Sequence, residues 1–217
     1  MKDLRTLHDH MFRTEPGMVP VIRKEIYRYL GYRKVSPEGA VLEMTESALA
    51  ESIPLITPGA ICESFPVKYE STYTDLGFTC TESKNIVQNL NGSEHIILLC
   101  ATIGARFDRL LFKYGKTKPV MEAVLQSVGA MLIESFLDDL NETLKKEGSL
   151  QGIALRPRFS PGFGDFDLSV QKDIFRALRT DRIGVTLTDS LLMAPTKSVT
   201  AIIGLKNIDR SIGENNG

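Results

Sequence analysis

The spacing of apolar residues changes several times along the N-terminal third of the chain. The segment VPVIRKEIYRYLGY (19–32) has apolar residues at helical intervals and stops at Gly31, which predicts a helix. A second helix is expected over residues 37–53, with Ser36 as its N-terminal cap. The following AICESFPVKYE alternates apolar and polar residues and leads into the turn-rich STYTDLGF, which indicates a strand or hairpin.

The middle of the chain predicts one buried strand among helices. A short helix is expected from Glu82 to Leu90, and the isoleucine-rich run EHIILLCATIG (94–104) has the length and composition of a buried strand. A helix over 106–114 should end at Gly115, before a long helix that runs from Pro119 to about Lys146. Apolar positions make this the predicted central helix: Val120, Val124, Leu125, Val128, Met131, Leu132, Phe136 and Leu140.

The C-terminal third predicts a strand, a helix and a final hairpin. IALRPRF (153–159) has the pattern of a strand, and a helix is expected over 168–178 with Asp167 or Ser169 as its cap. Two apolar strands should then meet across the turn APTKS, while residues 1–18 and 207–217 are expected to be loosely ordered. Strands scattered among helices, without regular βαβ alternation, predict one α+β domain over residues 1–217 with an antiparallel or mixed sheet.

Composition and charge exclude several classes of function. The formal charge of −1 supplies no basic field for nucleic acid. No segment reads as long and apolar enough to span a bilayer, and the charged start lacks a secretory signal, so a cytoplasmic location is expected. The cysteines Cys62, Cys80 and Cys100 are widely spaced, which indicates buried free thiols rather than a metal or redox site.

Common catalytic motifs are missing from the sequence. It contains no GxxxxGK[ST] phosphate loop, no GxSxG nucleophile elbow and no HExxH zinc helix. A metal site at the HDH of residues 8–10 is disfavoured, and GFG at 162–164 lacks the rest of a dinucleotide fingerprint. We therefore recognise no independent catalytic site.

The stretch RPRFSPGFGDF (156–166) concentrates residues suited to binding a small molecule. Its prolines stiffen an extended backbone, and its glycines permit a positive φ or the close approach of another group. Arg158 offers a planar fork for a carboxylate, and Phe159 or Phe163 a flat face for a purine or a sulfonium cation. The alternative is purely structural: the phenylalanines belong to the core, Arg158 is a surface cation and the glycines shape a turn.

One line along the long helix combines small residues with carboxylates. Ser127, Ala130, Glu134 and Asp138 follow one another at intervals of three and four residues, so another group could approach this side closely. Alternatively, Gly129 and Ala130 only permit tight packing of another element, and Glu134 is solvated.

Several motifs of the sequence resemble those of a known family. Arg158-x-x-x-Gly162-Phe163 is similar to the RxxxGY motif of the activation domain of cobalamin-dependent methionine synthase, which binds S-adenosylmethionine. GDFDLSVQKDIF and LTDSLLMAPTKSVTAIIG also resemble that domain, and EIYRYLGYR and GAMLIESFLDDL are similar to its free-standing version. The likeness extends over most of the chain.

The resemblance implies a C-shaped α+β fold with a mostly antiparallel sheet and a role in repair. In that family the domain holds S-adenosylmethionine against oxidised cob(II)alamin, while a flavodoxin-like protein supplies one electron for reductive methylation. The resemblance implies a module that acts in trans on a separate cobalamin-binding methionine synthase polypeptide. The cobalamin would belong to that partner, and the module would contact it only in the complex.

The family's site residues carry over only in part. By resemblance, Arg158 would bind the ligand's carboxylate, the main chain of Phe159 would lie along the ligand and Gly162 would permit close approach. Phe163 keeps the ring of the family's tyrosine without its hydroxyl, and Glu134 matches an acidic position on the helix that faces the cobalamin module. The partner carboxylate expected one turn earlier is Ala130.

Two alternatives of other classes remain open. The chain could be a scaffold of the same fold that binds a corrinoid protein without S-adenosylmethionine, which the absent hydroxyl and Ala130 favour. It could also be an independent small-molecule methyltransferase, for which only Glu134 or Asp138 is available as a general base.

Overall fold

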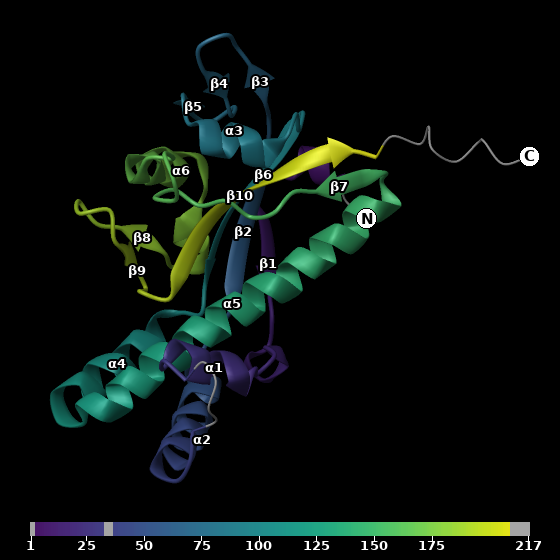
Figure 1. Ribbon diagram of the computed structural model, residues 1–217. Helices are drawn as coiled ribbons and strands as arrows, with labels where there is room; N and C mark the ends of the chain where they lie inside the picture. Colours follow the sequence, from purple (N-terminus) through teal and green to yellow (C-terminus); the bar gives the residue numbers. More distant parts are fainter. Residues whose placement is uncertain (1–2, 33–36, 209–217) are drawn as a thin grey trace, which may run out of the picture.

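The computed structural model describes residues 3–32 and 37–208, and its centre is a five-stranded antiparallel sheet (Figure 1). The strand order is β1-β2-β6-β10-β7. These strands are β1 (His10–Arg13), β2 (Gly59–Pro66), β6 (His95–Thr102), β10 (Ser198–Asn207) and β7 (Ile153–Leu155). The predicted fold class is confirmed, because a curled antiparallel sheet is flanked by helices.

The two faces of the sheet bury different sets of side chains. Alternate residues of a strand point to opposite faces, so in β6 Ile97 and Leu99 belong to one apolar cluster, and Ile96 and Leu98 to the other. The long helix α5 (Pro119–Leu150) covers the first face. Helices α3 (Lys84–Leu90) and α6 (Gln171–Ala177) cover the second face, on the other side of the sheet in Figure 1.

Helix α5 is the central helix, as its apolar pattern predicts. It packs against α1 (Arg23–Tyr29), α2 (Ala40–Ser52) and α4 (Ala105–Thr117), which gather at one end of the molecule in Figure 1. Of the predicted core positions only Val120, in the first turn, is exposed. By length and apolar composition α5 could cross a bilayer, contrary to the reading of the sequence, but 61% of its apolar window is buried inside the protein. That burial assigns the helix to core packing.

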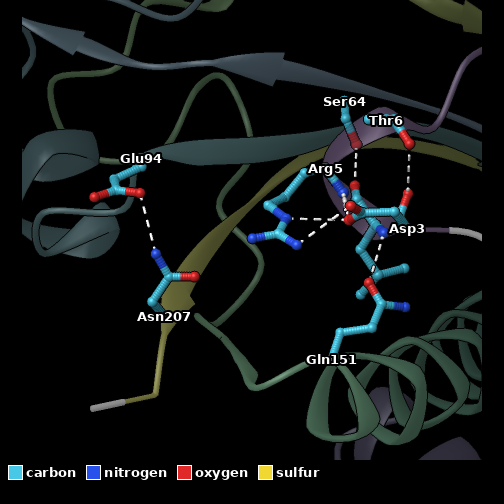
Figure 2. A network of polar contacts seen from close by, with 8 residues as sticks. Asp3, Arg5, Thr6, Ser64, Glu94, Gln151 and Asn207 are labelled. Carbon is cyan, nitrogen blue, oxygen red and sulfur yellow. Dashed lines mark hydrogen bonds and ion pairs between the residues drawn. The ribbon is translucent and has the colours of Figure 1, made fainter.

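Residues 3–18 contain defined elements with buried side chains, contrary to the expectation that residues 1–18 are loosely ordered. Short 3-10 helices η1 (Leu4–Thr6) and η2 (Pro16–Met18) flank β1, and Leu4 and Leu7 are buried. Figure 2 shows the polar contacts at this end of the sheet, including the backbone N–H of Leu4, which donates to Gln151 Oε1 at 2.9 Å. Asn207 Nδ2 donates to Glu94 Oε2 at 3.1 Å near the end of β10. Residues 1–2 and 209–217 lie outside the described part.

Two predicted N-terminal helices are shorter than their apolar patterns suggest. The residues before Arg23 form η2 and extended backbone instead of helix, so α1 spans only seven residues. Helix α2 begins at Ala40, because Gly39 has a φ of +56° that a helix excludes. The predicted cap Ser36 lies outside the described residues.

Other elements differ from prediction at glycines and in strand pairing. Helix α4 runs through Gly115, since one glycine is tolerated inside a helix. The predicted hairpin across APTKS is wrong, because Met193–Ala194 (β9) pairs with Thr186–Leu187 (β8), and β10 pairs with β6 and β7. After β2, where a hairpin was expected, a small three-stranded sheet forms from β3 (Lys68–Tyr69), β4 (Thr74–Asp75) and β5 (Cys80–Thr81). The described residues also contain the 3-10 helices η3 (Ile53–Leu55), η4 (Leu168–Val170) and η5 (Thr180–Ile183).

The cysteines differ in their surroundings. Cys62 and Cys100 are buried free thiols as predicted, and burial raises the pKa of Cys100 to about 12. Cys80 is exposed, so the prediction is wrong for that residue. It lies in the short strand β5, outside the main sheet that buries the other two.

Candidate functional site

The segment 156–166 forms one wall of a groove of about 390 Å³. Helix α5, the first residues of β10 and the start of α6 supply the other walls. In Figure 1 this segment is the green chain that leaves β7 and crosses β10 before α6. Polar and aromatic residues line the groove together: Glu134, Arg158, Phe159, Phe163, Gln171 and Thr200.

Arg158 is held at the groove by two carboxylates of α5. Its Nη2 donates to Glu134 Oε2 at 3.2 Å and to Asp138 Oδ1 at 2.9 Å. Its side chain is 20% exposed, against 45% for Glu134 and 67% for Asp138. The guanidinium is therefore less exposed than the two anions that bind it, and the three groups together carry one net negative charge.

Two residues that line this groove each carry a buried polar atom without a partner among the described residues. One is Arg158 Nη1, which is a donor, and the other is Oε1 of Gln171, which is an acceptor on a residue only 6% exposed. A buried polar atom without a hydrogen bond costs about 1–3 kcal/mol, so native proteins rarely leave such atoms unpaired. A ligand that carries both an acceptor and a donor could satisfy both atoms, as the carboxylate and ammonium groups of an amino acid would.

The backbone at Phe159 is used by the sheet rather than offered to a ligand. Phe159 N–H donates to the carbonyl of Ile202 at 2.9 Å, and Ile202 N–H donates back at 2.8 Å. The N–H and C=O groups of Phe159 are therefore both paired within the sheet, and the expectation that this main chain lies along a ligand stays a prediction. Among the described residues, the N–H groups of Arg158 and Ser160 have no hydrogen-bond acceptor, and both residues line the groove.

A tight turn follows the extended part of the segment. Gly162 has a φ of +91°, which explains the glycine without invoking a ligand, and its N–H donates to the carbonyl of Phe166 at 2.7 Å. Gly164 has a φ of +57°, and a Cβ there would lie 2.1 Å from Asn85 Oδ1. Both glycines are therefore required by the conformation of the chain.

Asp165 fastens this turn to the N-terminus of α3. Its carboxylate accepts from the backbone N–H of Lys84 at 2.9 Å, from that of Asn85 at 3.1 Å, and from the hydroxyl of Ser83. The hydrogen bond from Ser83 is the largest cause that lowers the pKa of Asp165, and the backbone N–H donors of Asn85 and Lys84 lower it further. The turn is thus held by a segment some 80 residues earlier in the chain.

Phe163 presents its ring to solvent at the mouth of the groove. Its exposure is 66%, while Phe159, whose ring centroid lies 6.5 Å away, is partly buried against the second apolar cluster. The two rings also border a second cavity of about 520 Å³, which Asn85, Gln88, Asn89 and Arg156 line. Phe163 is therefore the ring that can stack on a ligand, and Phe159 serves the core.

The small residues and the carboxylates on this side of α5 make different contacts. A Cβ at Gly129 would lie 2.5 Å from the ring of Phe107, so tight packing of another element is confirmed there. Glu134 and Asp138, farther along the line, bind Arg158 instead of being only solvated. Neither carboxylate is free of a cationic partner, which weakens the case for a general base at this position.

No metal centre is formed by the described residues. Over 3–32 and 37–208, no group of three or more His, Cys, Asp or Glu side chains could hold a metal ion. In the HDH motif, His8 Nδ1 lies 2.9 Å from Glu63 Oε1 and Asp9 contacts Arg182, so these side chains serve other contacts.

Sequence reasoning missed Gln171, Asp165 and Asn85. Gln171 is a polar residue at the start of a helix whose other inward positions are apolar, which is a weak signal for a buried amide. Asp165 is one of several aspartates near Gly164, and its partner lies in α3, so no local pattern distinguishes it. Asp167, by contrast, caps η4 through Ser169 N–H at 2.7 Å, as its position predicts.

Comparison with known proteins identifies the fold. No protein-family model matches the sequence, and no curated protein matches it. Among solved structures, the chain is similar to the MetH reactivation domain bound to AdoHcy, with a TM-score of 0.67 and 14% sequence identity. The similarity covers 92% of this chain and 78% of that one. The chain therefore has the fold of the MetH reactivation domain, as the motif around Arg158 indicates.

Proposed function

We propose that this chain is a reactivation module that binds S-adenosylmethionine and acts in trans on a cobalamin-dependent methionine synthase in the cytoplasm. The observation that carries the proposal is the pair of unpartnered buried atoms, Arg158 Nη1 and Gln171 Oε1, on two residues that line a groove together with the exposed Phe163. The shared fold with a domain solved with AdoHcy supports an adenosyl ligand of this class.

The residues present fit such a ligand by their chemistry. Arg158 would bind the ligand's carboxylate, Gln171 would accept from its ammonium group, and Phe163 would offer a face to the base or to the sulfonium. The unpaired N–H groups of Arg158 and Ser160 would add two donors. S-adenosylmethionine would supply the methyl group and leave as S-adenosylhomocysteine. The partner's cobalamin would receive the methyl group after one electron from a flavodoxin-like protein had reduced it. This chain contributes position and orientation.

The proposal is tested by calorimetric titration of the purified chain with S-adenosylmethionine. We expect weak binding that tightens when a cobalamin-bearing methionine synthase is added, because the partner selects the competent arrangement. Arg158→Ala should weaken binding by about 1.5–3 kcal/mol, the value of a hydrogen bond to a charged group. Arg28→Ala is the control, since Arg28 pairs with Glu25 on α1 and does not line the groove. Absence of binding, with and without the partner, would remove the proposal.

The action in trans has its own test. If the methionine synthase encoded in the same genome ends before its own activation module, a separate module is required. A synthase with a complete module of its own would argue against this role.

A second function is favoured by one specific observation. Nη2 of Arg158 already binds two carboxylates, so a ligand carboxylate must share the guanidinium with both. This crowding, with the missing hydroxyl at Phe163, favours a scaffold that binds a corrinoid protein without a methyl donor. Capture of a purified corrinoid-bearing synthase by a chain that binds no S-adenosylmethionine in the titration would select this function.

A further inference from the structure

Helix α4 has one apolar face and one basic face. Its apolar residues Phe107, Leu110, Leu111 and Tyr114 are buried. The remaining positions, at intervals of three and four residues, place five side chains on the solvent side: Arg106, Arg109, Phe112, Lys113 and Lys116. We call these five residues the α4 outer face; α4 lies at one end of the molecule in Figure 1.

The cations of the α4 outer face have no acidic partner among the described residues. Among the described residues, no ion pair involves Arg106, Arg109, Lys113 or Lys116. The exposed Lys118, which follows the helix, forms no ion pair there either. The nearby acids are engaged elsewhere, since Asp108 accepts from Thr196, Glu51 from Tyr114 and Glu122 from Gln126. In a chain with a net charge of −1, this face is therefore a local concentration of positive charge.

An exposed aromatic ring lies among these cations. Phe112 is 66% exposed, and Lys116 Nζ lies 4.1 Å from the centroid of its ring. A cavity of about 390 Å³ beside Phe112 opens between α4 and α5, and Val120, also 65% exposed, lies in the first turn of α5. Aromatic and arginine side chains are enriched at protein interfaces, and this face presents Phe112 together with Arg106 and Arg109.

We infer that the α4 outer face docks an acidic surface of another protein. The cations would pair with its carboxylates, and Phe112 would enter an apolar site on the partner. A lipid surface is disfavoured, because an interfacial helix inserts its apolar face and that face of α4 is buried against the core. Nucleic acid is disfavoured, since the basic field is confined to one short helix of an otherwise balanced chain. This inference does not rest on the proposed function, because no residue of the α4 outer face lines the groove.

The test places a photo-crosslinking phenylalanine at position 112 of the full chain, in cells that naturally express it. Position 73, where Tyr73 is 42% exposed in the connection between β3 and β4, is the control site. We expect a product that is specific to position 112 and whose crosslinked segment, identified by mass spectrometry, belongs to another protein and is rich in Asp and Glu. Lys113→Glu with Lys116→Glu should abolish it.

A second measurement uses the purified partner identified in this way. The double charge reversal on α4 should weaken binding at least tenfold, and added salt should weaken binding of the unmodified chain. The matched control reverses two exposed cations elsewhere, Lys24→Glu with Lys68→Glu, and should leave binding unchanged. A product with nucleic acid, lipid or a second copy of this chain would overturn the inference. The inference would also be overturned if position 112 gave no more crosslinked product than position 73, or if the charge reversal on α4 left binding unaffected.

Discussion

Asp165 and Asn85 hold each other through two reciprocal hydrogen bonds. Asn85 N–H donates to Asp165 Oδ1 at 3.1 Å, and Asp165 N–H donates to Asn85 Oδ1 at 3.0 Å. One residue belongs to the turn that borders the groove, and the other to the first turn of α3. The shape of the segment that borders the groove therefore depends on a contact with a distant helix, and this dependence can be measured.

Asp165→Asn should loosen the turn, because an amide cannot accept three hydrogen bonds as a carboxylate does. We expect a lower Tm and faster hydrogen exchange in residues 160–166. The folded-state pKa of Asp165 is lowered, so its stabilising effect is complete above the unfolded pKa of about 4 and is lost as the pH falls through the folded value. The difference in Tm between the unmodified chain and the variant should therefore shrink as the pH drops below about 4. A constant difference across this range would contradict the assignment.

Gly164→Ala should destabilise the turn more than the φ penalty alone, since the new Cβ would meet Asn85 Oδ1 at 2.1 Å. Gly152→Ala is the matched control, with a φ of +70° and no atom within 4 Å of the added carbon. In both variants the alanine must adopt a positive φ, which lowers the free energy of unfolding by about 1–2 kcal/mol. Chemical denaturation should show the larger loss for Gly164→Ala, and equal losses would mean that the contact with Asn85 is unimportant.

Asp138→Asn should strengthen the binding of S-adenosylmethionine, because it removes an anion that competes for Arg158 at 2.9 Å. An exposed ion pair contributes about 0.2–1 kcal/mol, so titration should show a decrease in Kd of up to about fivefold. Asp139→Asn, an exposed neighbour on the same helix, should leave the Kd unchanged. Weaker binding by the Asp138 variant would show that this carboxylate helps to hold the ligand.

Gln171→Met should affect stability and binding in opposite directions. Without a ligand, the change removes a buried acceptor that has no partner, and the free energy of unfolding should rise by about 1 kcal/mol. Binding of S-adenosylmethionine should weaken, since the ligand's ammonium group loses its acceptor. Gln126→Met, at an exposed position on α5, should change neither quantity appreciably. If the Gln171 variant binds normally, the groove is not the ligand site.

Gly129→Ala should destabilise the protein at the contact between α4 and α5. The added Cβ would lie 2.5 Å from Phe107 Cε1 and 2.9 Å from Lys197 Cε. Such overpacking costs about 1–3 kcal/mol. Gly115→Ala, whose nearest atom would be 3.7 Å away, should instead stabilise its helix by up to about 1 kcal/mol. Urea denaturation of the two variants measures both effects.

The sequence by itself determined the elements that follow from local periodicity. The buried strand β6 and the long helix α5 lie where the patterns predict them, because side-chain spacing along a strand or helix is set by the backbone and not by distant contacts. The motif around Arg158 and Gly162 also indicated the fold that the structural comparison identifies.

Only the tertiary structure decided which residues meet. Arg158 pairs with Glu134, and Asp165 is anchored on α3, although these residues are far apart in the sequence. The amide of Gln171 is unpartnered because packing buries it. The same holds for the N-terminal strand, whose residues alone suggested loose order until pairing with β2 gave its backbone hydrogen-bond partners. The physical reason is that burial and hydrogen-bond satisfaction are properties of the assembled sheet and helices, which no local pattern encodes.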